Sequence, residues 1–248
     1  MLRVTANTQL MREIVDLLAV LTEEAKMSWG EKGLTVNVVD GSHVALLSAT
    51  ISDACFETYE CEPVEIGLEL GKLRDLLTLA GPSDLVEIDY DDAVGAVNVR
   101  VGQVHRILRG LDTNSMSDPK LPVLDFGCSA TIDAEKLSRS LRAAKFVGEL
   151  VDLSLDSKEM RVSVTVEAGE GVNVSFESGE LSELTCPSPT QGTYSLQFLD
   201  PLTRKLASGL ASDVQVRFQD KYPLRLDWSS NDGGASWTYF LAPRVTND

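Results

Sequence analysis

The feature that most constrains this chain is an internal repeat of about half its length. When the second half is laid over the first, Leu137 falls on Leu10, at the same step of a helical pattern. A slightly larger shift places Ser212-Asp213 on Ser83-Asp84. Helix-like, strand-like and turn-like segments follow one another in the same order in both halves, although few residues are identical. The 248 residues therefore predict two similar domains, each large enough to bury its own core.

A connector separates the two predicted domains. Residues 111–125, LDTNSMSDPKLPVLD, are rich in Ser, Asp and Pro and show no hydrophobic period. Such a composition is typical of an inter-domain linker. We therefore expect a first domain over residues 1–110, the connector over 111–125 and a second domain over 126–248.

Most of each half alternates apolar and polar residues. This period of two predicts half-buried antiparallel strands. The segments expected to form strands are 34–39, 85–90, 97–101, 104–108, 160–166, 172–176, 214–218 and 237–241. The predicted fold class is α+β: two similar domains of antiparallel sheets with two helices each.

Four segments have helical spacing instead. The pattern predicts helices over 8–21, 72–80, 134–147 and 201–208. Asp133 is the expected N-cap of the third, and Gly81 is expected just past the end of the second. For the fourth, Asp200 followed by Pro201 predicts a cap and a first turn.

Charge is segregated between these elements. The chain has 22 Lys and Arg against 38 Asp and Glu, a net charge of −16, which alone argues against nucleic acid. Yet the four predicted helices sum to +5, so the rest of the chain sums to −21. One basic helix face is as well explained by solvation, but the same bias over four helices favours contact with phosphate on one surface. The basic residues are Arg12, Lys72, Arg74, Lys136, Arg139, Arg142, Lys145, Arg204 and Lys205.

Catalytic and metal-binding patterns are scarce. Neither the spacing of Cys55, Cys61, Cys128 and Cys186 nor His43 and His105 builds a zinc site, so we expect reduced thiols and neither a metal nor a cofactor. No phosphate-binding loop or nucleophile motif occurs, and the chain is predicted not to be an enzyme. The enzyme alternative is a metal-dependent hydrolase that uses Glu87, Asp89 and Asp91, which alternation places on one strand face.

The N-terminal sequence MLRVTANTQLMREIV lacks the basic and apolar regions of an export signal, and no apolar run is long enough to span a membrane. We therefore expect an intracellular protein that is not secreted and does not bind membranes.

Several motifs resemble one known family. They are VDGSHVALL at 39–47, FETYEC at 56–61, GLEL at 67–70, KLPVLDF at the end of the connector and YFLAPRV at 239–245. Together they resemble the sliding clamps of the archaeal and eukaryotic type, the proliferating cell nuclear antigen family. The resemblance implies two similar domains per subunit and three subunits head to tail in a closed ring. It also implies an inner wall of helices facing duplex DNA.

The resemblance also implies residue roles. Arg12, Lys72, Arg139, Arg142 and Arg204 would face DNA, with Arg74, Lys136, Lys145 and Lys205 close by. A partner-binding pocket would include Val39, His43, Val44, Leu46, Pro119, Leu121, Pro223, Phe240, Leu241, Ala242 and Pro243. Packing between the two domains is the other explanation for these apolar residues.

The predicted function is that of a DNA polymerase processivity factor. The expected partners are double-stranded DNA without sequence preference, two further copies of the chain, and DNA polymerase, clamp loader, nuclease and ligase through short peptide motifs. The expected location is the cytoplasmic nucleoid in an archaeal cell and the nucleus in a eukaryotic one. A heterotrimeric or checkpoint-type clamp subunit is the alternative within the same fold.

Assembly follows from two predicted strands without a partner. Segments 104–108 and 172–176 each end a run of strands, and exposed strand edges tend to pair. Pairing of two unlike edges must close into a ring to avoid filaments. We therefore expect a homotrimer with three times the 26.9 kDa mass of one chain.

Overall fold

The structure is a computed structural model that describes residues 1–81, 83–166, 169–230 and 233–244. The chain divides into two compact units. The first contains Met1–Leu121 with Asp232–Trp237, and the second contains Pro122–Asn231 with Thr238–Asp248. Val245, the last residue of the YFLAPRV motif, lies outside the described residues.

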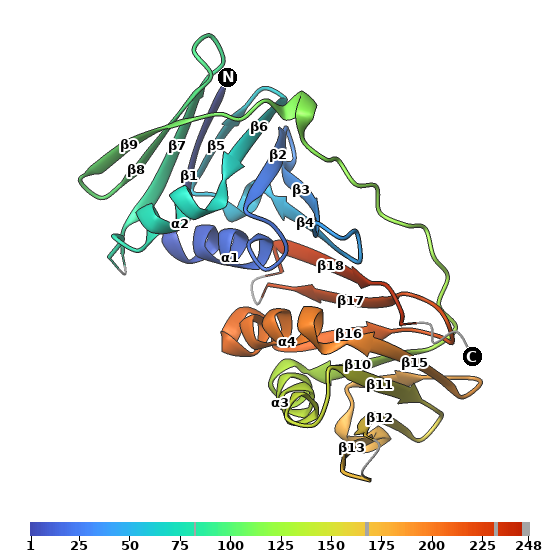
Figure 1. The fold of residues 1–248 in the computed structure, drawn as a ribbon. Coiled ribbons are helices and arrows are strands. Elements are labelled where there is room, and N and C mark those ends of the chain that lie inside the picture. The colour runs from blue at the N-terminus through green and yellow to red at the C-terminus, as the bar shows by residue number, and fades with distance from the viewer. Residues whose placement is uncertain (82, 167–168, 231–232, 245–248) are drawn as a thin grey trace. The chain divides into compact units, whose positions relative to one another are not determined.

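The first unit contains two antiparallel sheets and two helices (Figure 1). Its elements are β1 (Leu2–Asn7), α1 (Thr8–Leu18), β2 (Glu24–Gly30), β3 (Gly33–Val39), β4 (Ala45–Ser52), the short helix η1 (Asp53–Cys55), β5 (Thr58–Cys61), β6 (Val64–Glu69), α2 (Leu70–Leu77), β7 (Leu85–Asp91), β8 (Ala96–Val101), β9 (Val104–Arg109) and the short helix η2 (Thr113–Ser115). The strand orders are β5-β1-β7-β8-β9 and β4-β3-β2-β6.

The second unit repeats this arrangement. Its elements are β10 (Ser129–Asp133), α3 (Ala134–Lys145), β11 (Leu150–Leu155), β12 (Glu159–Thr165), β13 (Gly171–Glu177), η3 (Ser178–Glu180), β14 (Glu183–Thr185), β15 (Thr190–Ser195), α4 (Leu196–Lys205), η4 (Leu206–Leu210), β16 (Asp213–Arg217), β17 (Leu224–Ser229) and β18 (Ala235–Leu241). The strand orders are β14-β10-β16-β17-β18 and β13-β12-β11-β15. The start of β18 belongs to the first unit and its end to the second.

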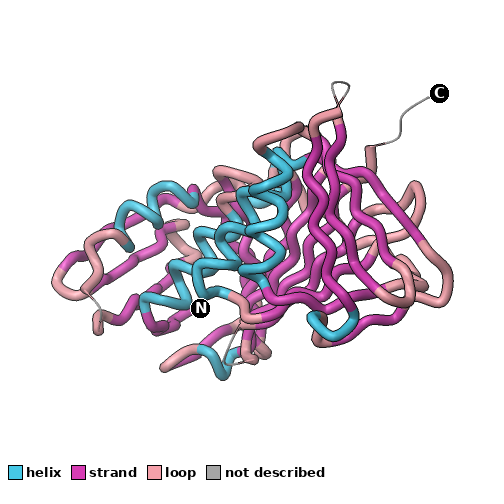
Figure 2. The backbone as a smooth tube through the Cα atoms, turned by 90° about the horizontal axis from the view of Figure 1, so that it is seen from below, coloured by secondary structure: helices cyan, strands magenta, loops and turns pink. Residues whose placement is uncertain are grey.

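The two halves match strand by strand. β1 pairs with β5 and β7, and β10 pairs with β14 and β16. Likewise β2 lies between β3 and β6, and β11 lies between β12 and β15. The α+β class with two similar domains is confirmed, and strands far outnumber helices (Figure 2).

Two of the helices follow the predicted start. The Asn7 side chain accepts the backbone N–H of Leu10 at 2.7 Å and begins α1. Asp133 caps α3 as predicted, accepting the N–H of Lys136 at 2.8 Å. Each helix then buries one apolar stripe, with Leu137 and Leu141 of α3 almost fully covered. Burial of these stripes against the sheets is the main stabilising term for helices of this length.

The fourth helix was predicted wrongly. It spans Leu196–Lys205, so Asp200 is not its cap and Pro201 lies inside it. Proline lacks an N–H and opposes an interior position by about 3 kcal/mol. Burial of leucines on both sides, Leu196 and Leu202, outweighs this cost. After α4 the chain turns within η4 at Gly209, whose φ of 104° is open to glycine at little cost.

Several helix ends also differ from the prediction, including that of α3, which ends at Lys145 rather than at residue 147. Helix α1 ends at Leu18 rather than at residue 21, and α2 begins at Leu70 and ends at Leu77. Gly81 does not close α2: its N–H donates to Asp84 Oδ2 at 2.8 Å and belongs to the next turn. No helix among the described residues is long and apolar enough to cross a membrane.

Candidate nucleic-acid interface

The second unit carries an open cationic groove between α3 and α4. Arg139 and Arg142 of α3 and Arg204 of α4 line it, with a volume of about 780 Å³. Phe146, 87% exposed at the end of α3, lies on its rim. Arg139 and Arg142 form no ion pair with any residue that the structure describes. Their guanidinium groups are therefore available to an anionic ligand.

The adjacent basic residues are partly neutralised by a buried acid. Asp200 accepts a hydrogen bond from Lys145 Nζ at 2.9 Å and one from Arg204 Nε at 2.8 Å. Burial alone would raise the pKa of Asp200, but its two cationic partners hold the pKa below the ordinary value. The charge of Lys136 is also partly neutralised, because its Nζ lies 3.8 Å from Glu180 Oε1. Lys205 is half-buried at the end of α4.

In the first unit, every predicted DNA-facing residue has a polar partner. Arg12 donates through Nη2 to the carbonyls of Leu77 at 2.8 Å and Ala80 at 3.2 Å, so it caps the end of α2. The other two form ion pairs, Lys72 with Glu69 at 2.5 Å and Arg74 with Asp16 at 3.4 Å.

The helices of the two units therefore differ in charge. The formal charges of the side chains on α1 and α2 sum to zero, whereas those on α3 and α4 sum to +4. One cation missed by the helix-based argument is Arg106 of β9, whose Nη1 donates to the Lys72 carbonyl at 3.1 Å. Sequence reasoning passed over it because it lies on a strand.

The predicted partner-binding residues of the first unit surround a tight turn and the connector. Val39, Val44 and Leu46 are half-buried, and His43 is exposed with a φ of 56°. Pro119 is half-buried and Leu121 is 39% exposed.

Asp40 holds this turn. Its carboxylate accepts the backbone N–H groups of Ser42, Val44 and Ala45 at 2.8, 2.7 and 2.6 Å, and the Ser42 hydroxyl as well. Burial would raise the pKa of Asp40, but these hydrogen bonds lower it overall. The carboxylate thus binds the backbone on both sides of His43, whose own N–H donates to the main-chain carbonyl of Asp40 at 3.0 Å.

The predicted partner-binding residues of the second unit lie deeper than expected for a surface. Phe240 and Leu241 are 5% and 0% exposed, whereas Pro223, Ala242 and Pro243 are half-buried. The Arg225 guanidinium lies over the Phe240 ring, 5.4 Å from its centroid. Phe240 therefore packs within its own unit as well as being a candidate contact.

The acidic side chains considered as a hydrolase site contact neighbouring basic groups and a backbone N–H. Asp89 accepts Arg3 Nε at 2.8 Å, Glu87 lies 3.7 Å from Arg100 Nη1, and Asp91 accepts the N–H of Ala93 at 3.0 Å. No cluster of three metal-ligating side chains occurs in the part of the chain that the structure describes.

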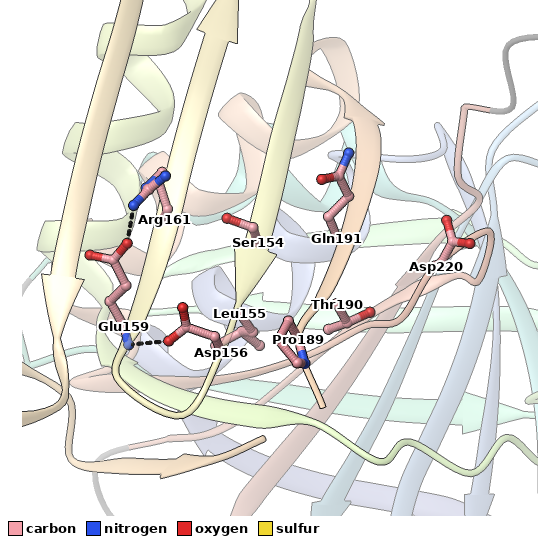
Figure 3. Close-up of a pocket in the computed structure, with 9 residues that line it drawn as sticks. All are labelled: Ser154, Leu155, Asp156, Glu159, Arg161, Pro189, Thr190, Gln191 and Asp220. Carbon is pink, nitrogen blue, oxygen red and sulfur yellow. Dashed lines mark hydrogen bonds and ion pairs between the residues drawn. The ribbon is translucent and has the colours of Figure 1, made fainter. Parts of the chain in front are cut away.

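A separate polar pocket of about 470 Å³ opens on the second unit (Figure 3). Two of its acids have partners: Glu159 pairs with Arg161, and Asp156 accepts the N–H groups of Lys158 and Glu159 at 2.7 and 3.0 Å. These two backbone bonds lower the pKa of Asp156. The pocket therefore presents no nucleophile with an adjacent base.

Known proteins resemble this chain in sequence and in fold. Residues 1–113 match the family model described as "Proliferating cell nuclear antigen, N-terminal domain". Over the full length of both chains, a protein of Methanoregula boonei named DNA polymerase sliding clamp is 25% identical, and one of Methanothrix thermoacetophila with the same name is 27% identical. The PCNA of A. fulgidus, solved with the C-terminal region of FEN-1 bound, has a TM-score of 0.91 at 23% identity with full coverage of both chains.

These comparisons support a DNA sliding clamp of the proliferating cell nuclear antigen family. Proteins of this family are processivity factors without catalytic activity, so the prediction that the chain is not an enzyme is confirmed and the hydrolase alternative is wrong.

Proposed function

We propose that three copies of this chain close into a ring around duplex DNA, and that the ring holds replication and repair proteins on the template. The observation that carries the proposal is the charge of the helices. In a chain of net charge −16, the four observed helices sum to +4, and two arginines on α3 are exposed without ion-pair partners in the described residues. A protein that acts on genomic DNA belongs inside the cell, in the nucleoid if that cell is archaeal.

The ring would close through β9 of one copy and β13 of the next. Hydrogen-bonded pairs alternate along an antiparallel ladder. In β8–β9 the N–H of Gly110 donates to Gly95 O at 3.0 Å, so by alternation the N–H of Ile107 points away from β8. In β12–β13 the N–H of Val166 donates to Glu170 O at 3.0 Å, so the N–H of Asn173 points away from β12. Each strand thus offers an open edge for pairing.

The internal repeat contains the same kind of strand pairing within one chain. β13 corresponds to β4, and β9 corresponds to β18 in the order of elements. Within the first unit β4 is covered by the start of β18: Ser52 donates its N–H to Gly234 O at 3.0 Å. Pairing of β9 with β13 between copies would reproduce the same joint between chains.

Charge at the two edges supports the same pairing. β9 contains Arg106 and Arg109, whereas β13 and its flanks contain Glu170, Glu177 and Glu180. Opposite charges on unlike edges favour a head-to-tail contact and oppose pairing of two like edges.

Retention on DNA tests the proposed function. A ring threads onto linear DNA from its ends, and blocking both ends afterwards should trap it through a high-salt wash. On DNA with open ends, or on DNA blocked before the protein is added, the wash should remove it. Equal retention on all three substrates would show that the protein binds DNA without encircling it.

Partner peptides are proposed to contact the exposed connector and the residues near the C-terminus. The PCNA of A. fulgidus binds the C-terminal region of FEN-1, which is the precedent for a short peptide ligand. DNA polymerase, clamp loader, nuclease and ligase are the partners we propose, each through such a segment. A segment of one or two turns buries less than a standard interface and depends on a few anchor residues.

Replacing Leu121 by alanine should weaken binding of a peptide with a glutamine and aromatic anchors by about five- to thirty-fold, or about 1 to 2 kcal/mol. Leu121 suits this test because it is 39% exposed, so its loss leaves the core intact. Calorimetry on the wild type and on Leu121→Ala measures the ratio, and Val123→Ala, fully exposed two residues away, is the matched control. Phe240→Ala should weaken binding similarly but also lower the melting temperature, because Phe240 is buried. Unchanged affinity in Leu121→Ala would limit this residue to packing.

A further inference from the structure

Two buried thiols in the second unit converge on one carbonyl oxygen. The Sγ of Cys128 lies 3.3 Å from Ser188 O, and the Sγ of Cys186 lies 3.1 Å from the same oxygen. The two sulfurs are thus no farther apart than the sum of these distances. Both residues are almost fully buried, at 5% and 7% exposure.

The strand register places the two residues opposite each other. β10 pairs with β14 through Ser129 opposite Thr185, and one step outward brings Cys128 opposite Cys186. Directly opposed residues of an antiparallel pair have Cα atoms about 4.5 to 5.5 Å apart. A disulfide spans Cα separations of about 4.4 to 6.8 Å. The backbone is therefore already arranged for a bridge.

We propose that Cys128 and Cys186 form a reversible disulfide that ties the edge strand β14 to β10. The oxidant is a low-molecular-weight disulfide. One cysteine, as thiolate, attacks the oxidant, forms a mixed disulfide and releases one small thiol. The second cysteine attacks the protein sulfur of that mixed disulfide and releases the second small thiol. Two protein thiols are oxidised, one small disulfide is reduced, and the two protons end on the released thiols.

The first unit has no equivalent pair of cysteines. Leu2 lies five residues before the N-cap Asn7, as Cys128 lies five residues before the N-cap Asp133. Leu2 is opposite Cys61 in β1–β5. The corresponding pair in the first unit therefore has one thiol and cannot close, so the bridge is particular to the second unit.

The bridge would secure a weak edge. β14 has only three residues and pairs with β10 alone among the described strands. Joining residues 128 and 186 closes a long loop, which is where a cross-link restricts the unfolded chain most. The pocket of Figure 3 passes close by, because Leu155, which lines it, accepts the Cys186 thiol through its carbonyl at 3.5 Å.

The thiol chemistry indicates a slow reaction. Burial and then the neighbouring Cys128 thiol raise the pKa of Cys186 to about 12, so little thiolate exists near neutral pH. The bridge would thus form during prolonged oxidising conditions and persist, rather than respond within seconds.

Oxidation of the purified full-length protein by oxidised glutathione tests the proposal. Intact mass should fall by about 2 Da, the loss of two hydrogen atoms, and peptide mapping should link Cys128 to Cys186 within one chain. Free thiols counted in denaturant should fall from four to two. The melting temperature should rise by about 5 °C and return to its starting value after reduction.

Variants separate this outcome from unspecific oxidation. Cys128→Ser and Cys186→Ser should each abolish the link, whereas Cys55→Ser should leave it intact. Leu2→Cys should add a second link to Cys61 and calibrates the geometry. Three results would overturn the proposal. The first is glutathione that stays on one cysteine, and the second is a link through Cys55. The third is a Leu2→Cys variant that forms the link to Cys61 but not the link between Cys128 and Cys186.

Discussion

Ile107→Pro is expected to convert a trimer, built from three chains of 26.9 kDa, into a monomer. The N–H of Ile107 points away from β8, so proline removes a donor from the open edge and leaves the β8–β9 bonds in place. The variant loses the hydrogen bond that the N–H of residue 107 would donate to the next chain, and the proline side chain would clash with the facing strand. Together these effects should weaken association at least about 100-fold, or about 2.7 kcal/mol. Light scattering after size exclusion gives the mass, and circular dichroism confirms the fold.

Two further variants show whether the joint uses unlike edges. Ile107→Thr keeps the N–H and should remain trimeric. Asn173→Pro blocks the β13 edge and should also give a monomer. An equal mixture of Ile107→Pro and Asn173→Pro retains one intact edge of each kind and should form a heterodimer of two 26.9 kDa chains. A trimer of Ile107→Pro, or monomers only in the mixture, would contradict pairing of β9 with β13.

Arg139→Ala combined with Arg142→Ala should weaken binding to a short duplex by about 10- to 100-fold at low salt. The two arginines lack ion-pair partners in the described residues, so their full charge is available to phosphate. Each lost phosphate contact lowers the slope of log affinity against log salt by about 0.9, and three copies together should lower it by about 2 to 5. Fluorescence anisotropy over a salt series measures both quantities.

A control variant with the same change in charge separates a local contact from net charge. Arg100→Ala with Lys158→Ala removes two exposed cations, one on β8 and one in the turn before β12. Its affinity should change less than about two-fold. If both double variants lose affinity equally, the helices carry no special contact. Lys72→Ala should have a smaller effect than either arginine, because Lys72 is paired with Glu69.

Local patterns predicted much of this fold because the forces behind them are local. Alternation placed β7 and β8, and the cap at Asp133 placed the start of α3. The failure at α4 has the opposite origin. Asp200 and Pro201 have the local chemistry of a helix start, but burial of Leu196 and Leu199 depends on a core that only the folded unit supplies.

The helical location of the basic residues was predictable from the sequence, whereas their ion-pair and hydrogen-bond partners were not. All nine predicted basic residues lie on the observed helices. Arg204 forms an ion pair with Asp200, whereas Arg139 has no ion pair in the described residues. This difference depends on which acid the fold brings near each arginine. The role of Arg12 as a cap on α2 likewise joins residues 65 apart. No single-sequence pattern contains such distances.

The mass of the unmodified protein in solution tests the central claim most directly. Light scattering across micromolar concentrations should give three times 26.9 kDa, with no larger species as the concentration rises. That result means that the two unlike edges close into a ring of three identical chains. A constant mass of 26.9 kDa would mean that the ring requires different partner chains or does not form, and a mass that grows with concentration would mean that the edges build open filaments.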